Sequence, residues 1–97
     1  IDPEIQILKE IVFASKYEAD SAFNLLNSGI DFDELVMKYS ISSTKENKGL
    51  LGPINIQNYS KEISEKLSDL EEDEYTKPIP YGEHYIIFKR LKKNNRA

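Results

Sequence analysis

Cysteine is absent from this chain of 97 residues, and histidine occurs once, at position 84. Without cysteine there is no disulfide framework, no thiolate nucleophile and no cysteine-ligated zinc, so the fold must rest on packing. One imidazole among scattered carboxylates also lacks the ligand spacing of a metal site. We therefore expect neither a metal nor a cofactor.

The chain also lacks long apolar runs, and its 17 acidic residues outnumber its 13 lysines and arginines. No run approaches the roughly 20 apolar residues of a membrane-spanning helix, so we expect no direct insertion into a membrane. No basic and apolar leader is present, which leaves the compartment undecided. The formal net charge of -4 argues against a general attraction to nucleic acid.

What remains has the composition of a soluble folded domain, with 39% hydrophobic and 31% charged residues. The length suits a single domain over residues 1–97. Charge is uneven along it: residues 71–74 form an acidic run, predicted to be a solvated turn, and basic residues crowd the C-terminus. We interpret residues 92–97 as a basic tail or linker, with a partner-binding patch as the alternative.

Two helices are predicted with their ends marked. Ser15 and Glu18 form a capping box ahead of the first, and Gly29 follows where a left-handed C-terminal cap belongs. Asp31 and Glu34 repeat the capping pattern for the second. Each helix has one apolar face at the spacing i, i+3, i+4, i+7, formed by Ala19, Ala22, Phe23 and Leu26 in the first and by Phe32, Leu35, Val36 and Tyr39 in the second.

A third helix is predicted at about residues 59–70, with Asn58 or Ser60 as its N-cap and one apolar side. Residues 41–50 are polar and rich in turn formers, which predicts a loop. The strand signals lie at residues 5–14, at 50–54, and at 76–80 and 83–88, where the last two flank a tight hairpin. Pro53 is tolerable in its strand only at an edge or a bulge.

Two of the four glycines enclose a leucine pair in "GLLG", residues 49–52. Gly49 is predicted to turn the loop into the strand with a backbone conformation closed to branched residues. Gly52 is predicted to leave room beside the sheet for a helix or a peptide. Leu50 and Leu51 should then point to opposite faces of the strand. The alternative is that the glycines only fit the sheet to its packing.

The order and spacing of "EAD", "GIDFDELVMKYS", a polar loop, "GLLG", an amphipathic helix, "TKPI" and "YGEHYII" resemble the parvulin-type peptidyl-prolyl cis-trans isomerase (rotamase) domain, from about Glu10 to Leu91. The resemblance implies an α+β, FKBP-like fold: a four-stranded antiparallel sheet with three short helices in the order βααβαββ. Such domains catalyse rotation about the bond preceding proline, whose barrier is about 18–20 kcal/mol. No covalent bond is made or broken.

The family's site residues carry over only in part. Its first-strand histidine falls on Glu10, and the place of its last histidine falls on His84 or Tyr85. With one histidine in the chain, the family's imidazole pair cannot form. The resemblance implies catalytic candidates at His84, Glu10 and Ser42 and substrate-binding candidates at Leu50, Tyr59, Ile63 and Tyr85.

Two hypotheses follow for these candidates. His84 borders a substrate groove with Glu10 opposite it as an ion-pair partner, or it is a partly exposed residue without function. Tyr59, Ile63, Leu50 and Tyr85 form one exposed cluster for extended chains, or Ile63 and Leu50 are simply core.

This site, which lacks the family's histidine pair, is similar to that of parvulin domains in SurA-like periplasmic chaperones. This implies a domain of a bacterial periplasmic or secreted folding factor that binds unfolded, outer-membrane or proline-containing protein segments with weak or absent isomerase activity. The alternatives are an active isomerase and a purely structural or dimerisation domain. Oligomeric state is not indicated.

Overall fold

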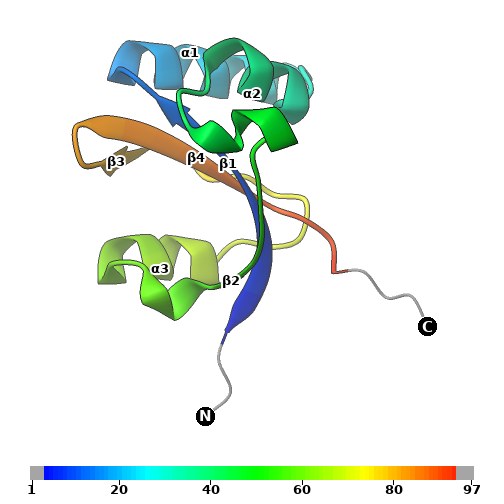
Figure 1. Cartoon of the computed structure of the whole chain (residues 1–97), viewed down its shortest axis with the longest axis vertical. Helices are drawn as coiled ribbons and strands as arrows, with labels where there is room; N and C mark the ends of the chain where they lie inside the picture. The colour runs from blue at the N-terminus through cyan, green and yellow to red at the C-terminus, as the bar shows by residue number, and fades with distance from the viewer. Residues whose placement is uncertain (1–3, 94–97) are drawn as a thin grey trace.

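The computed structural model describes residues 4–93, and the order of its elements is the predicted one (Figure 1). The strands and α-helices are β1 (Ile5–Phe13), α1 (Lys16–Asn27), α2 (Phe32–Tyr39), β2 (Leu50–Asn55), α3 (Lys61–Ser68), β3 (Ile79–Tyr81) and β4 (His84–Arg90). Two 3-10 helices, η1 (Ser43–Asn47) and η2 (Ile56–Asn58), stand on either side of β2. The predicted loop at residues 41–50 therefore contains a short helix.

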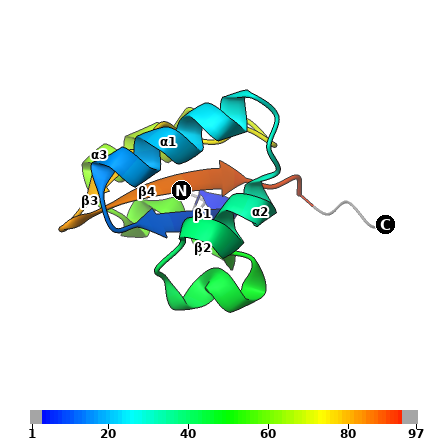
Figure 2. The same ribbon diagram turned by 90° about the horizontal axis from the view of Figure 1, so that it is seen from above.

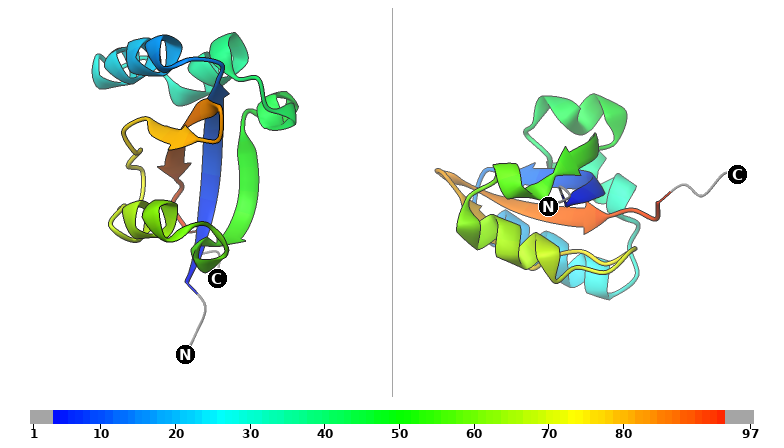
Figure 3. Two further views of the ribbon diagram at one scale, coloured as in Figure 1. Left: turned by 90° about the vertical axis from the view of Figure 1, so that its left-hand side faces the viewer. Right: turned by 90° about the horizontal axis from the view of Figure 1, so that it is seen from below.

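The four strands form one antiparallel sheet in the order β2-β1-β4-β3, which Figure 3 shows from the side. The long β1 lies inside the sheet and β2 at its edge, so Pro53 occupies an edge strand as predicted. The α+β class and the four-stranded antiparallel sheet with three helices are confirmed. None of the helices between residues 4 and 93 is long and apolar enough to cross a membrane.

Helices cover both faces of the sheet, with α1 and α2 on one side and α3 on the other (Figures 1 and 2). Side chains alternate between the faces along a strand, so even-numbered residues of β1 and β4 face α3 and odd-numbered ones face α1 and α2. Leu8 and Phe88 belong to the core on the α3 side, whereas Ile11 and Ile87 belong to the core on the α1–α2 side.

Both ends of helix α1 are capped as the sequence predicts. The Ser15 hydroxyl oxygen accepts a hydrogen bond from the Glu18 backbone N–H at 3.2 Å. At the other end Gly29 has φ +104°. Its N–H donates to the Leu26 carbonyl, and the Ile30 N–H donates to the Leu25 carbonyl, both at 3.1 Å. This pair of bonds is a Schellman motif, and it closes the helix where the glycine stands.

The other two helices start differently from each other. Asp31 is the N-cap of α2, but its side chain makes no capping hydrogen bond, so the predicted capping box is wrong there. Ser60, not Asn58, is the N-cap of α3, and its hydroxyl oxygen accepts from the Ile63 N–H at 3.4 Å. Asn58 instead ends η2.

Glycine stands at the two ends of "GLLG" for different physical reasons. Gly49 has φ +81°, and a Cβ there would lie 2.3 Å from the Glu10 carbonyl oxygen, so the predicted restriction is confirmed. Gly52 has φ +82°, yet a Cβ would meet nothing within 4 Å. No helix packs against Gly52, so that part of the prediction is wrong, whereas room for a peptide there stays a prediction. The positive φ by itself favours glycine at this position.

The register between β1 and β2 shifts inside this segment. Leu8 pairs with Gly52 while Lys9 pairs with Leu50, which leaves Leu51 as the extra residue of a β-bulge. Leu51 packs against the core on the α3 side, and Leu50 is 43% exposed.

The predicted C-terminal hairpin is present, but its two-residue turn lies one position later than predicted, at Gly82 and Glu83. Tyr81 pairs with His84, and Gly82, at φ +62°, supplies the positive dihedral that two-residue turns favour. Residues 71–74 are all exposed, as expected of a solvated turn. Residues 94–97 of the predicted basic tail lie outside the described part of the chain.

Candidate functional site

Glu10 lies in the middle of β1 on the α3 side of the sheet, and its side chain is buried, with 7% of the residue exposed. One carboxylate oxygen, Oε2, accepts hydrogen bonds from the Ser42 hydroxyl at 2.8 Å and the Thr44 hydroxyl at 2.7 Å. Glu10 and Ser42 were both predicted as site residues, and the fold brings them into direct contact.

Backbone contacts with β1 hold the loop that carries these hydroxyls. The Glu10 N–H donates to the Gly49 carbonyl at 2.9 Å, and the Ile41 N–H donates to the Val12 carbonyl at 2.9 Å. The Val12 N–H in turn donates to the buried hydroxyl oxygen of Ser40 at 3.2 Å. The loop thus follows the stretch of β1 that β2 leaves unpaired, which places Ser42 beside Glu10.

Tyr59 stands between η2 and α3, on the same side of the sheet. Its ring centroid lies 5.4 Å from that of Phe88, which is the residue opposite Glu10 on β4. Burial, with smaller contributions from the charges of Tyr81 and Glu10, raises the pKa of Tyr59 to about 12. The phenol therefore stays protonated at neutral pH and remains a hydrogen-bond donor.

His84 is not an ion-pair partner of Glu10. It begins β4 opposite Tyr81, whereas Glu10 lies opposite Phe88, four residues further along the strand. Four residues of strand span roughly 13 Å. The ion pairs among residues 4–93 include neither residue. The expected pairing is thus wrong, although strand alternation places both residues on the α3 side of the sheet.

The predicted exposed cluster of Tyr59, Ile63, Leu50 and Tyr85 does not exist as one surface. Tyr85 occupies an odd-numbered position of β4 and packs against the core on the α1–α2 side, away from Tyr59. Ile63 is only 6% exposed and belongs to the core beneath α3. Leu50 is exposed, so the alternative of a buried core position holds for Ile63 and fails for Leu50.

Two residues on the same side of the sheet as Glu10 were missed by sequence reasoning. Thr44 stands two positions after Ser42 in a polar loop, and only the turn of η1 brings both hydroxyls to one oxygen. Tyr81 was expected in the turn of the C-terminal hairpin, yet it is the last residue of β3, and its charge contributes to the raised pKa of Tyr59. Its pairing with His84 places it on the α3 side.

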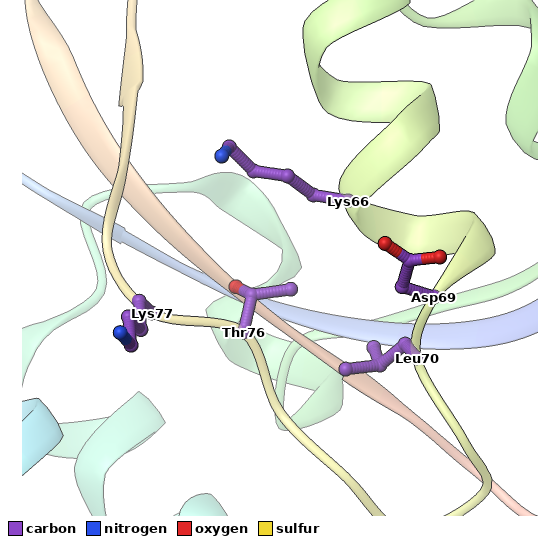
Figure 4. Close-up of a pocket in the computed structure, with 5 residues that line it drawn as sticks. All are labelled: Lys66, Asp69, Leu70, Thr76 and Lys77. Carbon is purple, nitrogen blue, oxygen red and sulfur yellow. The ribbon is translucent and has the colours of Figure 1, made fainter.

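A separate hollow of about 370 Å³ opens between the C-terminal end of α3 and the segment before β3 (Figure 4). Its lining comprises Lys66, Asp69, Leu70, Thr76 and Lys77. Tyr59 precedes the N-terminus of α3, so this hollow is at the other end of the helix. In the described part of the chain no group of acidic or histidine side chains is arranged to hold a metal ion.

The four-stranded antiparallel sheet with three helices is the fold of parvulin domains. Residues 9–92 match the family model described as "Rotamase: PPIC-type PPIASE domain", so the chain belongs to this family, the parvulins. Comparison with curated protein sequences gave no significant match.

Three solved structures with the same fold illustrate the likeness. PrsA from Bacillus cereus is 26% identical, with a TM-score of 0.86 over 96% of this chain and 36% of its own. The parvulin NmPin of Nitrosopumilus maritimus is 25% identical, with a TM-score of 0.77 over 95% of this chain and 100% of its own. A structure described among the SurA-like chaperones of Campylobacter jejuni is 23% identical, with a TM-score of 0.81 over 94% and 39%.

The chain spans only part of the larger relatives. It corresponds to 36% of PrsA from Bacillus subtilis and 44% of PrsA from Bacillus anthracis.

Proposed function

We propose that this chain is the parvulin domain of an extracytoplasmic bacterial folding factor. The domain binds unfolded, outer-membrane or proline-containing segments, and its isomerase activity is weak or absent. One observation carries the proposal: two hydroxyls hold the carboxylate of Glu10, the residue that the resemblance places where the family has its first-strand histidine.

A glutamate in place of the family's first-strand histidine affects catalysis more than peptide binding. Rotation about a prolyl bond is accelerated only by interactions that favour the twisted amide over both planar forms. Two facing imidazoles can exchange donor and acceptor roles, whereas an ionised carboxylate only accepts hydrogen bonds. The aromatic side chains Tyr59 and Tyr81 remain on that face to receive an extended peptide.

The relatives support the setting of the proposal. PrsA from Streptococcus pneumoniae is described as a foldase, and the Campylobacter protein as a SurA-like chaperone. We extend a folding role and a periplasmic or secreted location to this chain by that likeness. In this proposal residues 1–97 are one domain, with residues 92–97 as a basic tail or linker.

NMR exchange spectroscopy on an Ala-Pro peptide tests this function, because it reports binding and rotation in one experiment. We expect the peptide to shift the amide signals of Tyr59 and Tyr81 while cis-trans exchange stays close to the uncatalysed rate of tens to hundreds of seconds. The control variant is Tyr85→Phe, on the far face of the sheet, which should leave binding unchanged.

Two results would overturn the proposed function in favour of an alternative. Fast exchange that His84→Ala abolishes would establish the active isomerase. A stable dimer without any peptide-induced shift would establish a structural or dimerisation domain.

A further inference from the structure

Both outer strands of the sheet have a free edge. The strand order β2-β1-β4-β3 leaves one side of β2 and one side of β3 without a neighbouring strand (Figure 3). A free edge presents unpaired backbone N–H and C=O groups, which can pair with an extended chain from another molecule. Each edge of this sheet carries an exposed proline, Pro53 on β2 and Pro80 on β3. The effect of each proline depends on which side of its strand the ring nitrogen faces.

The ring nitrogen of Pro53 faces the free side of β2. Successive residues of an antiparallel strand turn their backbone polar groups to alternate sides. Pro53 lies opposite Ile7 on β1, and the Ile7 carbonyl accepts a hydrogen bond at 2.8 Å from the N–H of Leu91, the residue that follows β4. Ile7 therefore directs its backbone groups away from β2, and the Ile7–Pro53 pair has no mutual hydrogen bonds. The N–H that proline lacks would have pointed out of the sheet.

Pro80 has the same orientation at the opposite edge. The Phe88 carbonyl accepts a hydrogen bond at 2.8 Å from the N–H of Thr76, in the segment that leads into β3. Even-numbered residues of β4 therefore direct their backbone groups toward the β3 side, and odd-numbered ones direct them toward β1. Pro80 lies opposite the odd-numbered Tyr85. Its missing donor thus faces outward too.

Neither edge offers a regular stretch of backbone beside its proline. Strand β3 has only three residues, and Pro80 is the middle one. In β2 the bulge at Leu51 interrupts the ladder on one side of Pro53, and a bulge twists an edge away from a partner. A strand added to either edge would therefore meet a proline, where its own carbonyl finds no donor.

We propose that Pro53 and Pro80 close the two edges of the sheet to strand addition by a second copy of this chain. Two copies can meet with β2 antiparallel to β2 across a two-fold axis, because each presents the same edge to the other. A backbone N–H at position 53 removes the gap in that pairing and opens the edge. This inference depends on the strand register and not on the proposed function.

Sedimentation equilibrium of Pro53→Val and of the unmodified chain, over the same concentrations, tests the closure. We expect the variant to self-associate at least about tenfold more tightly than the unmodified chain. The new amide at position 53 should exchange with solvent more slowly in the dimer than in the monomer. The matched control is Gln57→Val, which adds an exposed valine just after β2 but no backbone donor. It should associate no more than the unmodified chain.

A second variant covers the other edge. If Pro53→Val does not fold, as judged by its amide spectrum, Pro80→Val takes its place, with the same expectations for association and for the amide at position 80. The proposal is overturned if the folded variant associates no more than the unmodified chain, or if Gln57→Val associates equally. It is also overturned if the amide at the substituted position still exchanges fast in the dimer, because the edge is then not the interface.

Discussion

At the scale of single residues, the chemistry of the site depends on which groups surround Glu10. A carboxylate in the middle of a buried strand is unusual because charged side chains are rarely buried without a partner. Here Ser42 and Thr44 supply hydroxyls in place of a cation. The position of Glu10 could be identified from sequence, but its partners come from a loop 32 and 34 residues further along the chain.

Gly49 and Gly52 form a matched pair for measuring steric cost. Both have nearly the same positive φ, +81° and +82°, but only at Gly49 would a Cβ strike the Glu10 carbonyl. We expect Gly52→Ala to lower the free energy of unfolding by about 1 kcal/mol from backbone strain, and Gly49→Ala by roughly 3 kcal/mol or more. Urea unfolding checks both, and equal losses would contradict the steric argument.

Tyr59 predicts a dependence of stability on alkaline pH. Its folded-state pKa is raised to about 12 from an ordinary value of 10.0, so between these values the folded state holds a proton that the unfolded state has lost. Stability is therefore intact below pH 10 and falls as pH rises toward 12.

Urea unfolding at pH 9 and pH 11.5 measures this fall. Tyr59→Phe, which has no phenol to titrate there, should show a smaller decrease than the unmodified chain. Identical decreases in both proteins would show that Tyr59 does not titrate as described.

At the scale of elements, helix boundaries depend on caps that look alike in sequence. Ser15 and Asp31 both stand three residues before a glutamate, yet only the Ser15 side chain bonds to its helix. The N-cap residue of α2 could be identified from the sequence, but the rotamer that Asp31 adopts could not. That choice depends on local surroundings that the pattern does not record.

Alanine substitution at the two caps tests this difference. Ser15→Ala should lower the free energy of unfolding by about 1 kcal/mol, because the Glu18 N–H loses its acceptor. Asp31→Ala should cost less than about 0.5 kcal/mol, because no capping bond is lost there. Thermal unfolding of the two variants checks the order, and a larger effect at Asp31 would refute it.

At the scale of the whole molecule, one sheet supports two separate cores. Adjacent residues of β4, Ile87 and Phe88, enter the core on the α1–α2 side and the core on the α3 side respectively. The residue after β4 also bonds to the first strand, since the Leu91 N–H donates to the Ile7 carbonyl at 2.8 Å. Neither helical layer can therefore keep its packing surface if the sheet is lost.

This arrangement predicts cooperative unfolding. Ile87→Ala leaves a cavity on the α1–α2 side and should cost about 2–5 kcal/mol. Because the sheet is shared, amide exchange in α3, on the other face, should accelerate by the same free energy. The exposed Ile30→Ala serves as the control, with little change in either measurement. Unchanged protection in α3 would show that the two cores unfold independently.

The amino-acid sequence alone determined the order of the elements, the apolar face of each helix, the restriction of Pro53 to an edge or a bulge, and the family. These depend on spacing and on backbone preferences within a few residues. Only the tertiary structure decided that Glu10 contacts Ser42 and Thr44, that His84 stands apart from Glu10, and that Tyr85 faces away from Tyr59. These outcomes depend on strand register, and a shift of one residue in register turns every side chain of a strand to the opposite face.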